Sequence, residues 1–270
     1  MTPAAAGPAG TATEEAGMGQ GERIDEWQVH QAIVGGEMFL EYMPLVSLAH
    51  GGRCVGGEAL VRWRRGGTVV MPMDFIPAIE NTPVAGTLTY WVIDTVAEQL
   101  GDWLRRTPDV HVGINVSPEV LGRGGLDYAS RKSRLLDVGG RILLEVTERG
   151  IPDRLGLEEL EEMSREGMQI ALDDVGTDGG NLLVLFQAPV DAIKLDGHVA
   201  HSIGPDGDSP LLRRIAPLIR ASGRTVVAEY VERPEQEAAF REAGVQLAQG
   251  WLYSRPLPAA QFIAWHAARS

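Results

Sequence analysis

Short apolar runs alternate with stretches of helical spacing along the chain from Glu37 onward. Apolar runs bounded by polar residues are typical of buried strands, and apolar residues three or four positions apart are typical of helices. Helices are therefore expected in several segments, including 91–104, 157–163, 211–219 and 235–243. Strands are expected in eight segments, at 39–48, 55–63, 110–116, 142–146, 170–172, 192–195, 226–228 and 245–248.

This alternation predicts an α/β fold, a modified (β/α)8 TIM-type barrel with one antiparallel strand. The alternative is an open, doubly wound sheet. The antiparallel strand is expected at the start, because only the Gly-rich segment 49–53 separates the first two runs, which is the spacing of a hairpin. Pro118, Pro152 and Pro234 each follow a strand candidate at a position where a helix can begin.

Polar side chains stand at the C-terminal ends of these strand candidates, with Glu58 inside the second run. In a barrel, such strand ends converge on the face that carries active sites. Carboxylates gathered there would repel one another unless cations lay among them. Oxygen ligands suit Mg²⁺ or Mn²⁺ rather than zinc. After Glu58 the residues are, in chain order, Asn115, Glu145, Glu148, Asp173, Asp174, Lys194, Asp196, Glu229, Glu232 and Gln249.

Each of these residues also has a purely structural interpretation. A lone Asp at a strand end can cap a helix, and Asn115 before Ser117 can belong to a turn. Glu148 can be an acidic residue in a first helical turn. Lys194 lies among apolar neighbours and therefore needs an anionic partner. Taken together, the residues favour one shared site.

Composition and charge narrow the function classes. The formal net charge is −13, which disfavours binding to bulk nucleic acid. Cys54 is the single cysteine, so no disulfide framework exists. Residues 1–22 are rich in Ala, Gly, Thr and Pro and resemble neither a signal nor a transit peptide, so we expect a disordered tail and a cytoplasmic location. No apolar run approaches the length of a membrane helix, so no membrane segment is expected.

Eight short motifs follow one another in an order that identifies a family. The motifs are Glu58–Trp63 (EALVRW), Phe75–Pro77 (FIP), Ile114–Ser117 (INVS), Glu145–Glu148 (EVTE), Asp173–Thr177 (DDVGT), Asp191–Asp196 (DAIKLD), Ala228–Glu232 (AEYVE) and Gln249–Trp251 (QGW). With them, the chain resembles the EAL-domain family of cyclic-di-GMP phosphodiesterases over roughly residues 30–265. We therefore expect a tail over 1–22 and one EAL domain over 23–270.

The resemblance implies a barrel that holds two divalent cations, Mg²⁺ or Mn²⁺, and hydrolyses cyclic-di-GMP to linear pGpG through an attacking water. It implies that Glu58, Asn115, Glu145 and Asp173 hold the first ion, and that Asp173, Asp174 and Glu229 hold the second. It assigns catalytic roles to Glu58, Glu229 and Lys194, of which Lys194 positions or deprotonates the water.

By the same resemblance, Arg62, Leu60 and Gln249 contact the substrate, and Glu148 braces the loop after the fifth strand. A homodimer is expected, and a separate sensory or regulatory protein is a further possible partner.

Three departures from the family pattern concern activity rather than fold. The loop after the fifth strand carries Val175, Asp178 and Gly179 in place of Phe, Gly and an aromatic residue. Tyr230 replaces a Gly beside Glu229, where the backbone angle can require glycine, and Met43 replaces a Gln. The alternative functions are therefore a catalytically weak or inactive cyclic-di-GMP receptor or protein-interaction module, and an unrelated metal-dependent barrel.

Overall fold

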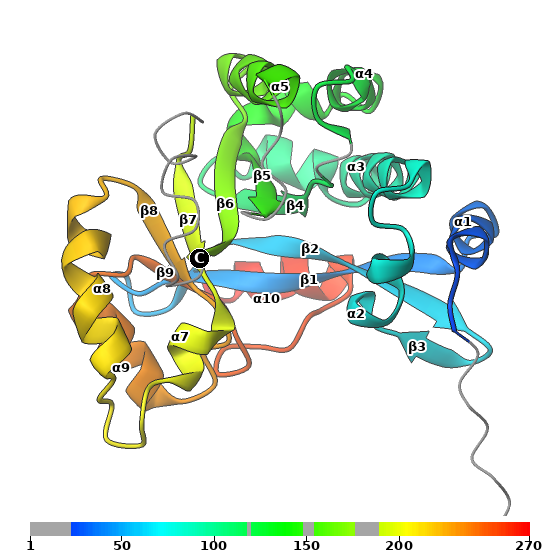
Figure 1. Cartoon of the computed structure of the whole chain (residues 1–270). Helices are drawn as coiled ribbons and strands as arrows, with labels where there is room; N and C mark the ends of the chain where they lie inside the picture. Colours follow the sequence, from blue (N-terminus) through cyan, green and yellow to red (C-terminus); the bar gives the residue numbers. More distant parts are fainter. Residues whose placement is uncertain (1–22, 118–119, 148–153, 176–188) are drawn as a thin grey trace, which may run out of the picture.

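The computed structural model describes residues 23–117, 120–147, 154–175 and 189–270 (Figure 1). For Asp174 and Val175, the description covers the backbone alone. The expected tail over 1–22, Pro118, Pro152, Glu148 and the loop positions Asp178 and Gly179 lie outside the described residues.

A closed barrel forms the centre of the described chain. Eight strands are hydrogen-bonded in the order β1-β9-β8-β7-β6-β5-β4-β2, and the pairing of β1 with β2 closes the ring. The predicted (β/α)8-type barrel is therefore confirmed, and the open sheet is wrong. The strands are β1 (Met38–Ser47), β2 (Arg53–Arg65), β3 (Thr68–Val70), β4 (His111–Asn115), β5 (Ile142–Thr147), β6 (Gln169–Val175), β7 (Ala192–Leu195), β8 (Thr225–Ala228) and β9 (Leu247–Ala248).

Strand β1 is the antiparallel member that the hairpin spacing predicts. It runs antiparallel to β2, with Tyr42 opposite Ala59, and also antiparallel to β9, with Val46 opposite Ala248. The remaining barrel pairs, from β2–β4 through β8–β9, are parallel. The short strand β3 was not expected, and it extends the β1–β2 hairpin outside the ring by pairing with the end of β2.

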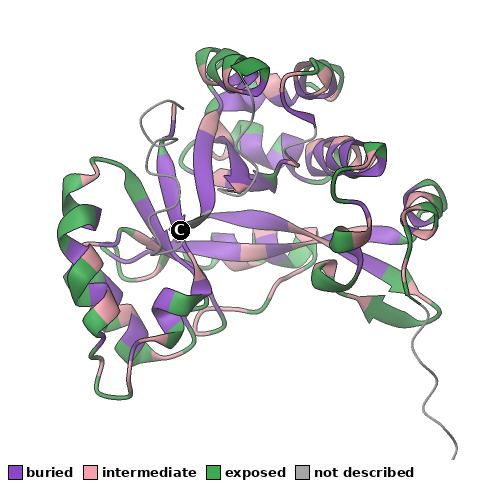
Figure 2. Ribbon diagram, in the orientation of Figure 1, coloured by how far each residue is buried: buried purple, intermediate pink, exposed green. Residues whose placement is uncertain are grey.

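Helices lie around the barrel, and they carry both buried and exposed residues (Figure 2). Their starts carry the expected signals: Pro83, Pro210 and Pro234 occupy first-turn positions, as the sequence predicts for Pro234. The helices are α1 (Glu26–Val34), α2 (Pro72–Phe75), α3 (Pro83–Arg106), α4 (Gly125–Lys132), α5 (Arg154–Arg165), α7 (Gly197–His201), α8 (Pro210–Ala221), α9 (Pro234–Ala243) and α10 (Ala259–Ala267), with the 3-10 turns η1 (Ile76–Ala78) and η3 (Leu135–Arg141).

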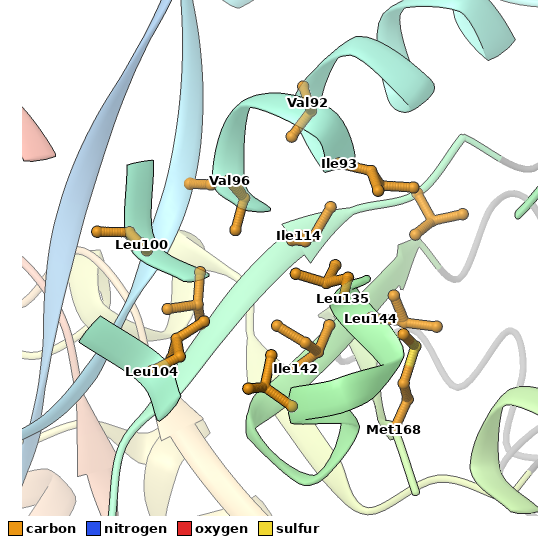
Figure 3. Close-up of a cluster of buried hydrophobic side chains, with 14 of the residues drawn as sticks. Val92, Ile93, Val96, Leu100, Leu104, Ile114, Leu135, Ile142, Leu144 and Met168 are labelled. Carbon is orange, nitrogen blue, oxygen red and sulfur yellow. The ribbon is translucent and has the colours of Figure 1, made fainter. Parts of the chain in front are cut away.

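The largest apolar cluster joins α3 to the strands beneath it. Val92, Val96 and Leu104 of α3 point toward Ile114 of β4 and Ile142 of β5 (Figure 3). These positions follow the three-to-four-residue spacing read from the sequence, because that spacing places side chains on one helical face. Burying each such side chain contributes about 1.5–3 kcal/mol, so the cluster holds β4 and β5 firmly in register.

Helix α10 packs on the middle of β1 and the first half of β2. The ring of its Phe262 stacks on Tyr42 of β1 at 5.5 Å between centroids. Gly57 of β2 admits that ring, because a Cβ there would lie 2.7 Å from it. No helix within the described ranges is both long enough and apolar enough to cross a membrane.

Candidate active site

Lys194 lies at the centre of a buried charged cluster at the C-terminal ends of the barrel strands. Its side chain is 2% exposed, and its Nζ contacts four carboxylates of the described chain. The distances from Nζ are 2.6 Å to Glu145 Oε2, 2.9 Å to Glu229 Oε1, 3.1 Å to Glu58 Oε2 and 3.2 Å to Asp173 Oδ1. The anionic partner that the sequence predicts for Lys194 is thus a group of four residues, three within β2, β5 and β6 and one directly after β8.

Two amide side chains fix the carboxylates of this cluster. Gln249, after β9, donates from Nε2 to Glu58 Oε2 at 2.6 Å and to Glu229 Oε1 at 2.8 Å. Asn115, at the end of β4, donates from Nδ2 to the other oxygen of Glu58 at 2.8 Å. Because Asn115 gives its amide hydrogen to Glu58, the carbonyl oxygen of its side chain remains available as a ligand.

Burial and charge act in opposite directions on these groups. Burial raises the pKa of Glu229 to about 8, although Lys194 lowers it. Burial and the neighbouring Glu58 raise the pKa of Glu145 well above its ordinary value. Burial by itself would raise the pKa of Glu58, but Lys194, Gln249 and Asn115 outweigh it, so that pKa is lowered. Burial likewise opposes the charge of Lys194, and the four carboxylates nevertheless raise its pKa well above the ordinary value.

Gly113 is a site residue that the sequence analysis missed. It lies in the interior of β4, and a Cβ at this position would collide with Oε1 of Glu145. The absent side chain therefore makes the space in which Glu145 reaches Lys194. A glycine inside a strand often marks such a close approach, so the signal was present in the sequence.

Arg62 and Leu60 follow Glu58 along β2 and lie outside the charged cluster. Arg62 is buried, and its Nε pairs with Glu41 Oε2 on the neighbouring strand at 2.9 Å. Leu60 lines a pocket of about 540 Å³ between β2, β4 and the start of α3. Its wall is mainly apolar, including Ile76 and Leu88, with Asn115 and Thr147 on its polar side. Asn115 thus belongs to both the charged cluster and the pocket.

Tyr230 occupies the left-handed backbone region. Its φ is +54°, and among the described residues that are not glycine only Asn81 and Arg134 also have a positive φ. An aromatic residue in this region is unusual, because its Cβ crowds the backbone. The backbone angle at this position, beside Glu229, is thus one that glycine tolerates better, as the sequence predicts.

Most of the chain matches the model of a known protein family. The family model described as EAL domain matches residues 26–256. The chain belongs to the EAL domain family. The expected resemblance is therefore confirmed, and the unrelated metal-dependent barrel is excluded.

Relatives of this EAL chain include named cyclic di-GMP phosphodiesterases. It is 35% identical over 242 residues to the probable cyclic di-GMP phosphodiesterase PdeB of Escherichia coli K12, covering 88% of this chain and 46% of PdeB. It is 30% identical over 247 residues to the cyclic di-GMP phosphodiesterase PdeR of the same organism, covering 88% and 37%. The EAL chain thus spans less than half the length of either relative.

Solved EAL structures share the fold. The PaMucR phosphodiesterase in its c-di-GMP complex superposes with a TM-score of 0.77 at 30% identity, covering 87% of this chain and 98% of that one. The EAL enzyme Bd1971, in its cAMP- and cyclic-di-GMP-bound form, also has a TM-score of 0.77, at 28% identity, covering 88% and 67%.

The remaining residues that the EAL motifs predict for the site lie outside the charged cluster or outside the described part of the chain. Asp196 caps α7, because its Oδ1 accepts from the backbone N–H of His198 at 2.6 Å, so the structural interpretation holds for this residue. Asp174 belongs to β6, and its side chain is outside the described part. Glu148 lies wholly outside the described residues.

The donor set of the EAL site fits a hard divalent cation. Glu58, Glu145, Asp173 and Glu229 converge, and Asn115 offers an amide oxygen. Within the described cluster these four carboxylates contact a single ammonium, so they outnumber the positive charge beside them. All of these donors are oxygen atoms, which Mg²⁺ and Mn²⁺ prefer. In the ranges described, no three acidic, His or Cys side chains are grouped around a single metal position, and the carboxylates are directed at Nζ of Lys194.

Proposed function

We propose that this chain hydrolyses cyclic di-GMP to linear pGpG by a two-metal mechanism. One observation carries the proposal: the convergence of four buried carboxylates, Lys194 and Gln249 at the mouth of an EAL barrel. Active sites of barrel enzymes lie at this end of the strands. Membership of the EAL family and the phosphodiesterase names of PdeB and PdeR support the choice of substrate.

The metal ligands are proposed from the oxygen donors of the cluster. Glu58, Asn115, Glu145 and Asp173 would hold one Mg²⁺ or Mn²⁺, and Asp173, Asp174 and Glu229 would hold the other. When bound, the two ions would acidify a water and neutralise the charge that develops on the phosphodiester. The need for cations follows from charge, because the ligand is an anion and the chain has a net charge of −13.

Side chains of the chain itself would orient the reactants. Lys194 would offset carboxylate charge and position the attacking water, since its Nζ lies within 3.2 Å of each of the four carboxylates. Gln249 would hold Glu58 and Glu229 at a fixed separation by donating to both. Preorganised contacts of this kind need no rearrangement during the reaction, which is where their catalytic value lies.

Residues beside the cluster would bind the nucleotide. The pocket lined by Leu60 has the size of small-molecule sites and a mainly apolar wall, so it would take one nucleoside half of the ligand. Arg62 would assist at a phosphate, a role for which guanidinium groups are suited. Because Arg62 already pairs with Glu41, its guanidinium would either contact both groups at once or leave Glu41 for the phosphate.

A second candidate function is a catalytically weak or inactive receptor or interaction module. The observation that favours it is Tyr230, a strained aromatic residue directly after Glu229 where the family has glycine. The altered residues Val175, Asp178 and Gly179 point the same way, because they follow the proposed metal ligand Asp174 within five positions. A homodimer and a separate sensory protein remain predictions for either function.

A turnover assay separates the two functions. The protein is incubated with cyclic di-GMP and Mg²⁺, Mn²⁺ or EDTA, the products are resolved by chromatography, and binding is measured by calorimetry. Formation of pGpG with Mg²⁺ or Mn²⁺ but not with EDTA supports the enzyme. Binding without product supports the receptor. The absence of both binding and product refutes the enzyme and the receptor and leaves the interaction module.

A further inference from the structure

The strained residue Tyr230 marks the rim of the barrel mouth. It follows Glu229, whose carboxylate lies 2.9 Å from Nζ of Lys194, and it precedes Val231, which is fully buried. The side chain of Tyr230 is 55% exposed. An aromatic ring therefore stands at the surface one residue away from the charged cluster.

The surrounding backbone imposes the left-handed conformation. The N–H of Val231 donates to the carbonyl oxygen of Gln249 at 3.1 Å, and the N–H of Leu252 donates to the carbonyl oxygen of Val231 at 2.9 Å. Gly250 allows this approach, because a Cβ there would collide with the backbone of Val231. With Glu229 turned into the cluster and Val231 turned into the core, residue 230 must make the sharp turn between them.

Glycine would make that turn at less cost, so a tyrosine needs a reason beyond the backbone. Conformations of this kind persist where the surroundings over-determine them, and they gather at binding sites and active sites.

The ring is held in a defined place. A Cβ at Gly197, the first residue of α7, would lie 2.7 Å from Cδ2 of Tyr230, so the ring occupies the space that this glycine leaves. The ring of His201 lies beside it, with 5.9 Å between centroids and a tilt of 46°. A ring placed in this way is preorganised, and little further ordering is needed when a ligand arrives.

We infer that Tyr230 contacts the substrate by stacking its ring against a purine base of the bound dinucleotide. This inference rests on the proposed function, because it takes cyclic di-GMP as the ligand. Every base has a π-face, and an aromatic side chain at the edge of a nucleotide site provides a matching surface. The ring of Trp251, on the adjoining loop, is already covered by the guanidinium of Arg255 at 4.0 Å.

Calorimetry with cyclic di-GMP, in Ca²⁺ and again in EDTA, tests the inference. Tyr230→Phe keeps the ring and should bind as the wild type does. Tyr230→Leu keeps an apolar side chain but removes the ring. It should bind cyclic di-GMP roughly tenfold to a hundredfold more weakly, which is the effect expected from losing the stacking of one base. Tyr128→Leu is the matched control, because Tyr128 is 68% exposed on α4, and it should bind unchanged.

A second measurement distinguishes contact from positioning. In Tyr230→Trp, saturating cyclic di-GMP should change the tryptophan emission more than it does in the wild type, because the new indole would touch the base. If the wild type binds cyclic di-GMP and Tyr230→Leu binds it with the same affinity, the stacking role is overturned and the proposed function stays intact. Weaker binding in Tyr230→Leu without an added emission change in Tyr230→Trp would also overturn stacking. A wild type that binds no cyclic di-GMP would overturn the proposed function and the inference together.

Discussion

Replacing Lys194 by Met should destabilise the metal-free protein more than an ordinary substitution does. The ammonium lies within 3.2 Å of Glu58, Glu145, Asp173 and Glu229, and all four are buried. Removing one partner of a buried ion pair costs about 3–5 kcal/mol, because the remaining charge loses its compensation. For a chain of this size, that corresponds to a fall of roughly 6–20 °C in the unfolding midpoint.

Thermal unfolding in EDTA, followed by circular dichroism, measures this loss. The chain offers a matched control, since its only other lysine, Lys132, is exposed and pairs with Asp94 at 3.3 Å. Lys132→Met should therefore change stability by no more than about 0.5 kcal/mol. If Lys194→Met unfolds within 1 °C of the Lys132→Met variant, the carboxylates do not depend on the ammonium, and the reasoning from the buried cluster fails.

Three further predictions concern chemistry. Glu58→Gln should lower turnover by orders of magnitude, because it removes a charged ligand from a site where stabilisation by the metal ions is worth several kcal/mol. The control is Glu98→Gln at an exposed position, and near-normal turnover of Glu58→Gln in a steady-state assay contradicts the assignment of Glu58 as a metal ligand. Ca²⁺ should support binding of cyclic di-GMP but not its hydrolysis, because its longer bonds and looser geometry misplace a water; equal product formation with Ca²⁺ and Mg²⁺ argues against the two-metal mechanism. Burial raises the pKa of the Cys54 thiol to about 11 from an ordinary 9.0, so folding keeps the thiol protonated and stability is lost as the pH rises from about 9 through 11. Alkylation of this thiol at pH 8 should therefore be far slower in the native protein than in the urea-unfolded protein, and equal rates measured by mass spectrometry refute this.

The sequence by itself determined the barrel and the end of the barrel at which the charged cluster lies. Apolar runs and helical spacing are local periodic signals, and they placed the eight barrel strands and the helices α3, α5, α8 and α9. The short segment 49–53 was enough to predict the antiparallel hairpin. Because parallel strands in a barrel end on one face, the order of polar residues along the chain predicted a convergence. Glu145, Asp173 and Glu229 meet at Lys194 as this predicts, whereas Asp196 caps α7 instead.

Only the tertiary structure decided which partners these side chains choose. Nothing in the order of residues indicates that Lys194 contacts four carboxylates at once or that Arg62 pairs with Glu41. Such contacts join residues far apart in the sequence, and they depend on strand register and on the space left by neighbouring side chains. Periodicity reports which face a residue occupies, whereas distances of about 3 Å between charges are set by the packing of the whole barrel.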